Sequence, residues 1–173
     1  FITEHIEHRY YRHEMNQPNS NILLSLIQGD EGKAWAADKN GWKENNQDAC
    51  DWEHIECDHS NKHITSILIA STNFSGTIPN ALGALSKLEK IIMVDNALKG
   101  TIPRHVAALP NLVEFNIFEN RITGTLPYFA SEHLEILNLG HNDLHGAIPN
   151  KFLASKNTLQ QLRMPQNRLA GFI

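Results

Sequence analysis

Apolar residues recur in a fixed triplet through residues 64–173. In each triplet the second apolar residue comes three positions after the first, and the third comes two positions later. The five triplets are Ile64/Ile67/Ile69, Leu88/Ile91/Met93, Leu112/Phe115/Ile117, Leu134/Leu137/Leu139 and Leu159/Leu162/Met164. A spacing of two residues is typical of a β-strand with one buried face. We therefore expect one short strand in each repeat, with these side chains pointing inward.

Turn-forming residues follow each triplet in a constant order. An amide side chain comes first, then a glycine, then in four of the five repeats a proline. The amides are Asn96, Asn120, Asn142 and Asn167, with Thr72 at that place in the first repeat. The glycines are Gly76, Gly100, Gly124, Gly146 and Gly171, which are 24, 24, 22 and 25 residues apart. Asparagine can both donate to and accept from the backbone of a turn, and glycine permits a positive φ.

A strand this short cannot bury its apolar face alone. Stacking successive repeats into a parallel sheet buries it, which is how a solenoid is stabilised. We expect the segments 80–85 and 104–109 to return along the outer face as short helical turns. The sequence thus predicts an α/β solenoid with a parallel sheet of about five strands on its concave side.

The repeats resemble the plant-type subfamily of leucine-rich repeats. The segments 64–79, 88–103, 112–127, 134–149 and 159–173 fit the template L-x-x-L-x-L-x-x-N-x-L-x-G-x-I-P, apart from the last proline. The endings GTIP, GTIP, GTLP and GAIP carry the resemblance. Members of this family include receptor-kinase ectodomains, receptor-like proteins and polygalacturonase-inhibiting proteins. The resemblance implies that residues 63–173 form a curved leucine-rich-repeat solenoid.

Residues 19–62 are similar to the N-terminal cap of this family. Apolar residues at positions 22, 23, 26 and 27 have helical spacing, which predicts a helix in the cap. The segment from Cys50 to Cys57 matches the cap motif C-x-W-x-G-V-x-C at both cysteines and at Trp52, with His54 in place of glycine. The cap context predicts a Cys50–Cys57 disulfide and an oxidising compartment. Two reduced, buried thiols in a cytosolic protein are the alternative. Residues 1–18 form a flanking arm or linker.

The outward residues of the strands would form a ligand-binding concave face, as solenoids use such surfaces for recognition. Ile92, Val94 and Phe118 would form an exposed apolar cluster, fringed by charged side chains, which is the anatomy of a protein-binding patch. The alternative is that a neighbouring segment covers them or that they are scattered contacts with solvent. The candidate ligand-binding residues are Lys90, Ile92, Val94, Asp95, Glu114, Asn116, Phe118, Glu119, Ile136, Asn138, His141 and Arg163.

Composition narrows the function classes. The net charge of −4 argues against nucleic acid as a partner. No apolar run reaches the roughly 20 residues that cross a bilayer, so a membrane would be reached only through a segment outside this sequence. The glycines are spaced by the repeat rather than clustered, and no nucleophile elbow or kinase signature occurs. We therefore expect no enzymatic activity, no cofactor and no metal site.

These observations predict an extracellular or cell-surface recognition module that binds a protein or peptide, as part of a receptor and with a co-receptor as a second candidate partner. The alternatives are a secreted inhibitor of a cell-wall hydrolase, a structural or adhesive protein, and a cytosolic scaffold. Asn73 begins a glycosylation sequon, Asn73-Phe74-Ser75, with Asn73 expected outward and Phe74 inward. Because Ile173 falls inside a repeat, we expect further repeats beyond it.

Overall fold

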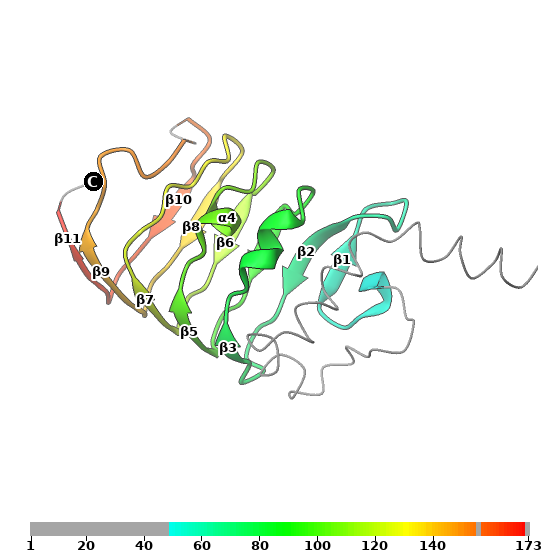
Figure 1. Ribbon diagram of the computed structural model, residues 1–173, viewed down its shortest axis with the longest axis horizontal. Helices are drawn as coiled ribbons and strands as arrows, with labels where there is room; N and C mark the ends of the chain where they lie inside the picture. The colour runs from blue at the N-terminus through cyan, green and yellow to red at the C-terminus, as the bar shows by residue number, and fades with distance from the viewer. Residues whose placement is uncertain (1–48, 155–156, 172–173) are drawn as a thin grey trace, which may run out of the picture.

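The computed structural model describes residues 49–154 and 157–171. The expected flanking arm and the cap helix around positions 22–27 lie outside the described residues. The described part of the cap begins with a short 3-10 helix, η1 (Ala49–Asp51), followed by the strand β1 (Ile55–Cys57). From there the chain winds through the repeats, and the elements follow one another along an arc (Figure 1).

The first sheet contains one strand from each repeat. Its order is β1-β2-β4-β6-β8-β10; β1 comes from the cap, and from β2 onward strands that neighbour each other in space are one repeat apart in sequence. The strands after β1 are β2 (Ile64–Leu68), β4 (Lys90–Ile92), β6 (Glu114–Asn116), β8 (Ile136–Asn138) and β10 (Gln161–Arg163). These five pair in parallel, whereas β1 runs antiparallel to β2. The expected parallel sheet is confirmed.

The register of this sheet is constant from repeat to repeat. Ser66 pairs with Lys90, Lys90 with Glu114, Glu114 with Ile136, and Ile136 with Gln161. Equivalent positions of the repeats therefore form columns across the sheet, as the alignment of the sequence template predicts.

A second parallel sheet, which the sequence analysis did not anticipate, is built from residues around the repeat glycines. Its order is β11-β9-β7-β5-β3. The strands are β3 (Ser75–Thr77), β5 (Ala97–Thr101), β7 (Arg121–Gly124), β9 (Asp143–Ala147) and β11 (Arg168–Ala170). Each repeat thus crosses two sheets before it returns along the outer side (Figure 1).

Two of the outer segments are helical turns. The 3-10 helix η2 (Asn80–Ala84) starts after Pro79, and α4 (Arg104–Ala107) starts after Pro103. The two prolines have φ of −74° and −66°, and proline is well suited to the start of a helix because its missing N–H would have no partner there. The expected helical turns at 80–85 and 104–109 are confirmed. Among the described residues no helix has the length and apolar character needed to span a bilayer.

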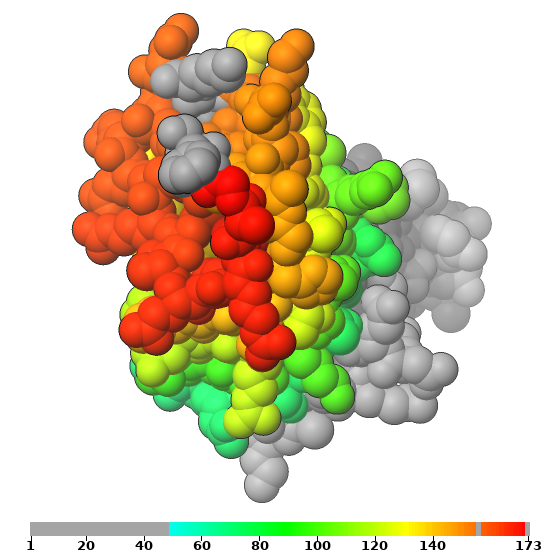
Figure 2. Space-filling view, turned by 90° about the vertical axis from the view of Figure 1, so that its left-hand side faces the viewer, coloured from blue at the N-terminus to red at the C-terminus, as the bar shows by residue number. Residues whose placement is uncertain are grey.

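The core lies between the two sheets and the outer segments. The apolar triplets of the first four repeats are buried, with exposed fractions of at most 1%. Phe74 and Phe129 fill the core beside them, and neither is exposed at all. The fifth triplet (Leu159, Leu162, Met164) is only half-buried, because in the described chain no repeat is stacked on its far side. Figure 2 looks at this end of the solenoid, with the fifth repeat in front of the fourth.

Candidate ligand-binding surface

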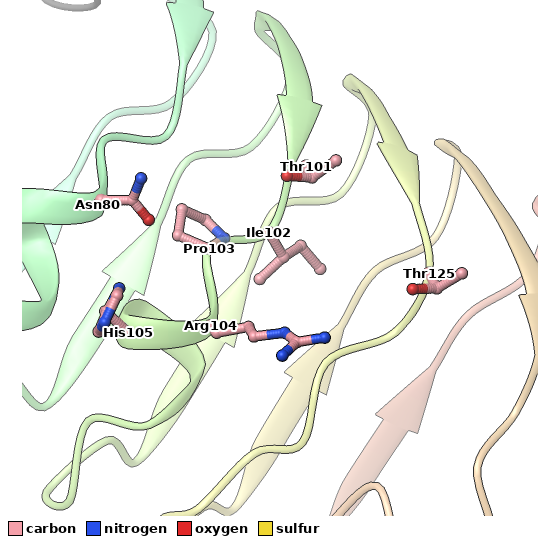
Figure 3. A pocket seen from close by; sticks show the side chains of 7 residues that line it. All are labelled: Asn80, Thr101, Ile102, Pro103, Arg104, His105 and Thr125. Carbon is pink, nitrogen blue, oxygen red and sulfur yellow. The ribbon is translucent and has the colours of Figure 1, made fainter.

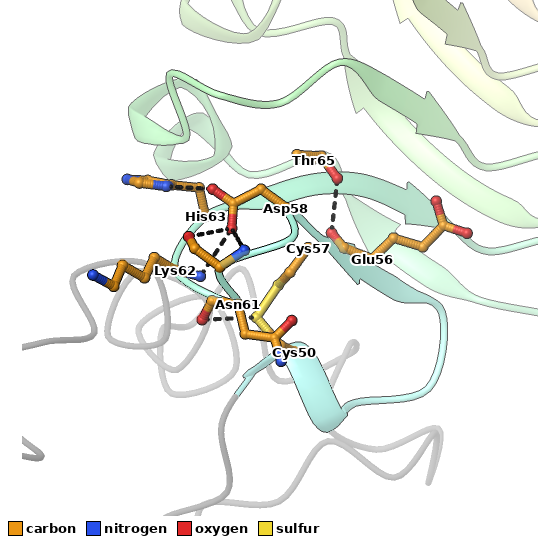
Figure 4. Close-up of a disulfide and its surroundings, with 9 residues drawn as sticks. Cys50, Glu56, Cys57, Asp58, Asn61, Lys62, His63 and Thr65 are labelled. Atoms are coloured by element: carbon orange, nitrogen blue, oxygen red, sulfur yellow. Dashed lines mark hydrogen bonds and ion pairs between the residues drawn. A yellow bond between two sulfur atoms is a disulfide. The ribbon is translucent and has the colours of Figure 1, made fainter.

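The described end of the cap is closed by a disulfide. Cys50 and Cys57 are bonded, with their Cα atoms 5.6 Å apart, inside the usual range for a disulfide (Figure 4). No free cysteine occurs in the chain. The disulfide ties η1 to β1, the first strand of the sheet. The predicted Cys50–Cys57 pairing is confirmed.

Asp58 organises the turn that joins β1 to β2. Its carboxylate accepts hydrogen bonds from the Ser60 hydroxyl (2.7 Å), the Nδ1 of His63 (2.7 Å) and the backbone N–H of Lys62 (3.1 Å) (Figure 4). These bonds, led by that from Ser60, lower the pKa of Asp58 far below its usual value because they favour the charged carboxylate. All of these partners lie in the turn itself, so the cluster serves the local structure. The described residues contain no group of three or more metal-ligating side chains.

The repeated asparagines connect neighbouring repeats. Each side-chain oxygen accepts from a backbone N–H of the preceding repeat: Asn96 from Phe74 (2.8 Å) and Asn120 from Leu98 (3.0 Å). Each side-chain nitrogen donates to a carbonyl at the end of the first-sheet strand in the preceding repeat, as Asn120 does to Met93 (2.7 Å). Asn142 and Asn167 repeat this arrangement. The expected role of these amides in the turns is confirmed, and it fixes the spacing of the strands that carry the concave face.

The twelve candidate binding residues lie on or directly after the strands β4, β6, β8 and β10. Among them Lys90, Asp95, Glu119 and Arg163 are exposed. The others are half-buried: Ile92, Val94, Glu114, Asn116, Phe118, Ile136, Asn138 and His141. The expected apolar cluster of Ile92, Val94 and Phe118 is therefore half-buried rather than exposed. Strands only about 4.8 Å apart bring side chains of one column into contact, which reduces the exposure of each.

Phe118 belongs to an apolar strip on this face, formed with Gly140 and Pro165. Its ring lies 4.8 Å from the ring of His141, between centroids, at an angle of 57°. A Cβ atom at Gly140 would come within 3.3 Å of the Phe118 ring and 3.0 Å of the Pro165 ring. Phe118, Gly140 and Pro165 occupy one column in three successive repeats. The absence of a side chain at Gly140 thus allows the two rings to approach each other across it.

The residues that precede the repeated asparagines, and the residue before Thr72 at the same place in the first repeat, adopt a left-handed backbone conformation. They are Ser71, Asp95, Glu119, His141 and Gln166, with φ between 52° and 59°. The repeated backbone pairing holds them there, since the N–H of Asp95 donates to the carbonyl of Phe118 and that of Glu119 to the carbonyl of Gly140. Glycine or asparagine adopts this conformation with less strain. Sequence reasoning missed this feature, because none of the five residues is glycine or asparagine, which adopt this conformation most readily.

Comparison with known proteins identifies the repeat. A family model described as Leucine Rich Repeat matches residues 133–154. A probable receptor-like serine/threonine-protein kinase with leucine-rich repeats from Arabidopsis thaliana is 36% identical over 56 residues, which are 32% of this chain and 9% of the relative. A polygalacturonase inhibitor from Vitis vinifera is 45% identical over 47 residues, 27% of this chain and 14% of the relative. The matched segment is thus a small part of the length of either relative.

Solved structures have the same architecture. The BIR2 ectodomain from Arabidopsis thaliana superimposes with a TM-score of 0.75 over 90% of this chain and 83% of its own. The two sequences are 23% identical, so this similarity supports only the fold. The plant peptide hormone receptor RGFR1, solved in complex with RGF2, is 34% identical over 56% of this chain and 16% of its own, with a TM-score of 0.53. One leucine-rich repeat is thus matched at residues 133–154, and the chain is similar in sequence to segments of plant receptor-like kinases and of a polygalacturonase inhibitor, and in fold to a plant receptor ectodomain.

Proposed function

We propose that the chain recognises a protein or peptide ligand through its concave face, outside the cell, as part of a receptor-type protein. The observation that carries this proposal is the strip of Phe118, Gly140 and Pro165 with exposed charges beside it. An apolar centre with a charged rim is the usual composition of a protein-binding patch.

The left-handed residues support the same surface. Asp95, Glu119 and His141 keep bulky polar side chains at positions where glycine would relieve backbone strain. Strain that persists at a surface is a reason to infer a function for the side chains that cause it. These side chains stand at the edge of the apolar strip, where they would select a ligand of complementary charge.

The similar proteins support a peptide or protein as the ligand class. RGFR1, a plant peptide hormone receptor, was solved in complex with RGF2, and it is 34% identical to this chain over the region that the two share. A second ectodomain, that of HAESA, was solved both with the IDA peptide and with the co-receptor SERK1. Its similarity to this chain supports only the fold. A co-receptor is accordingly a second candidate partner.

An extracellular location is part of the proposal. The Cys50–Cys57 disulfide persists in an oxidising compartment and is rare in the cytosol. Asn73, the sequon residue, is exposed, and Phe74 is fully buried, so an attached glycan at Asn73 would extend into solvent. Within this proposal residues 19–62 form the cap and 63–173 the repeats.

Inhibition of a cell-wall hydrolase is a second candidate function. The polygalacturonase inhibitor is the more identical of the two relatives described above, at 45% over its short matched segment. This function predicts saturable inhibition of a polygalacturonase by the chain, with loss of inhibition when the concave face is altered. A receptor module would leave the hydrolase rate unchanged.

Selection of ligands from a random peptide library displayed on phage tests the leading proposal. Ligands selected on the 173-residue chain are expected to bind at least about tenfold more weakly to Phe118→Ser and Ile92→Ser, because each variant removes apolar contact area from the concave face. Tyr128→Ser is the matched control, since Tyr128 is the exposed large apolar residue of the described chain and lies outside the strands of the first sheet. Circular dichroism verifies that all variants are folded.

The result that opposes the proposal is equal affinity of the selected peptides for the wild type and for Phe118→Ser and Ile92→Ser. Thiol labelling of the protein purified from its natural source tests the location. We expect Cys50 and Cys57 to react only after reduction. Labelling of both cysteines in the native protein would direct the search to cytosolic partners.

A further inference from the structure

A small pocket lies away from the concave face, where the second sheet passes into the outer segments. The pocket is open to solvent. Its volume of about 320 Å³ is at the low end of the range for small-molecule sites. Three successive repeats contribute to it: Asn80 begins η2, Thr101 ends β5, Arg104 and His105 belong to α4, and Thr125 follows β7 (Figure 3).

The base of the pocket is apolar and its edge is polar. Ile102 and Pro103, both buried, form the base. In Figure 3 the hydroxyls of Thr101 and Thr125 face the side of Pro103. Their methyl groups point the other way, and that of Thr101 lies 2.8 Å from the position that a Cβ atom at Gly124 would take. The packing of the methyl against glycine therefore holds the hydroxyl toward the pocket.

The polar groups of the pocket have no partner within the described chain. Within the described residues, the side chains of Asn80, Thr101 and Thr125 form no hydrogen bond. The described chain contains three ion pairs, His54–Glu53, His63–Asp58 and Arg168–Asp143. None of them involves Arg104, so no described carboxylate neutralises its charge. The lining contains no acidic residue at all. The pocket consequently carries a net positive charge beside an array of hydrogen-bonding groups.

We propose that this pocket binds an acidic sugar. The Arg104 guanidinium would pair with a carboxylate or sulfate group, because its planar fork matches the geometry of an oxyanion. The Thr101 and Thr125 hydroxyls and the Asn80 amide would bond the hydroxyls of the sugar, since these groups both donate and accept. Pro103 and Ile102 offer an apolar surface to the C–H face of the ring. This site is independent of the proposed concave-face function.

Titrations monitored by two-dimensional amide NMR of the 173-residue chain test the inference. The probes are methyl glucuronide, glucose 6-sulfate, neutral methyl glucoside and inorganic sulfate. We expect saturable shifts at residues 101, 102, 104 and 105 with glucuronide, with glucose 6-sulfate or with both. The affinity should be at least about tenfold weaker for methyl glucoside and for inorganic sulfate, since each lacks one half of the recognised chemistry. Which acidic probe binds identifies the carboxylate or the sulfate as the natural group.

Variants locate the binding. Arg104→Gln should weaken binding of the acidic probe by about tenfold or more, whereas Arg121→Gln, an exposed arginine of β7 outside the pocket, should leave it unchanged. Thr101→Val keeps the methyl that contacts Gly124 and removes only the hydroxyl, so it should weaken binding a few-fold without loss of folding. The inference is overturned if no probe gives saturable shifts, or if Arg104→Gln and Arg121→Gln lose affinity for the acidic probe equally. It is also overturned if inorganic sulfate binds as tightly as the acidic sugars (an adventitious ion only), or if methyl glucoside binds as tightly as they do.

Discussion

The side-chain oxygen of Asn142 accepts a 2.9 Å hydrogen bond from the backbone N–H of Ile122, one repeat earlier. The amide nitrogen of the same side chain donates to the carbonyl of Ile117 at 2.9 Å and to that of Leu139 at 3.2 Å. Asn142 is only 8% exposed. One buried amide thus satisfies backbone groups of two repeats that have little access to water, and it couples the stacking of the repeats to the path of the turn.

Replacing Asn142 with alanine should lower the free energy of unfolding by about 2–4 kcal/mol, because it leaves two or more buried backbone groups without a partner at about 1–3 kcal/mol each. Urea unfolding followed by circular dichroism measures the change. Asn150→Ala, at an exposed position, is the matched control and should stay within about 0.5 kcal/mol of the wild type. Equal stability of the two variants would show that the ladder of amides is dispensable.

The first sheet could be predicted from the sequence because its cause is local and repeated. The two-residue spacing of Ile67 and Ile69, and of its equivalents, specifies an inward face in every repeat, and the constant repeat length specifies the register. The second sheet gives no such signal. Segments such as Ser75-Gly76-Thr77 carry no apolar alternation and contain glycine, which is depleted in strands, and they pair because the stacking of the repeats brings their backbones together.

The candidate site was predictable in part for the same reason. Alternation along each strand tells which side chains face outward, and all twelve candidates do lie on or directly after the strands of the first sheet. It does not tell how far they are exposed, since the burial of Phe118 depends on Gly140 and on Pro165 in the next repeats. Nor does it reveal the pocket around Arg104, which needs residues from three repeats.

Gly124→Ala should destabilise the protein by about 1–3 kcal/mol. Gly124 has a φ of +87°, and an added Cβ would lie 2.8 Å from the Thr101 methyl. Both the backbone conformation and the contact oppose the substitution. Thermal unfolding of Gly124→Ala, Thr101→Ser and the double variant separates the two effects. Because Thr101→Ser removes the methyl, the double variant should recover part of the loss. If the double variant loses as much stability as the two single variants together, the whole effect of Gly124→Ala comes from the backbone conformation.

Asp58→Asn should make the protein less stable at about pH 7 but not in strong acid. The pKa of Asp58 is lowered in the folded state, mainly by the hydrogen bond from Ser60, so its stabilisation is complete above its ordinary value of 3.8. That stabilisation is lost as the pH falls below this value toward the folded pKa. The difference in urea midpoint between wild type and variant should therefore shrink steadily below about pH 4. A difference independent of pH would mean that the charge of Asp58 is irrelevant. Asp51→Asn, at an exposed position, is the control.

Glu119→Asn should stabilise the fold and weaken ligand binding at the same time. Glu119 has a φ of 59°, a left-handed conformation that asparagine adopts with less strain, so the expected gain is about 0.5–1 kcal/mol. The same change removes a charge from the rim of the apolar strip, which should slow association with a peptide of opposite charge. Thermal unfolding measures the gain, and the salt dependence of binding to a selected peptide measures the loss. Glu132→Asn, at an exposed position without positive φ, is the control and should change neither quantity. A stabilised variant that binds as well as the wild type would mean that the strain at Glu119 serves no recognition, and the left-handed column would then be a consequence of the strand exit alone.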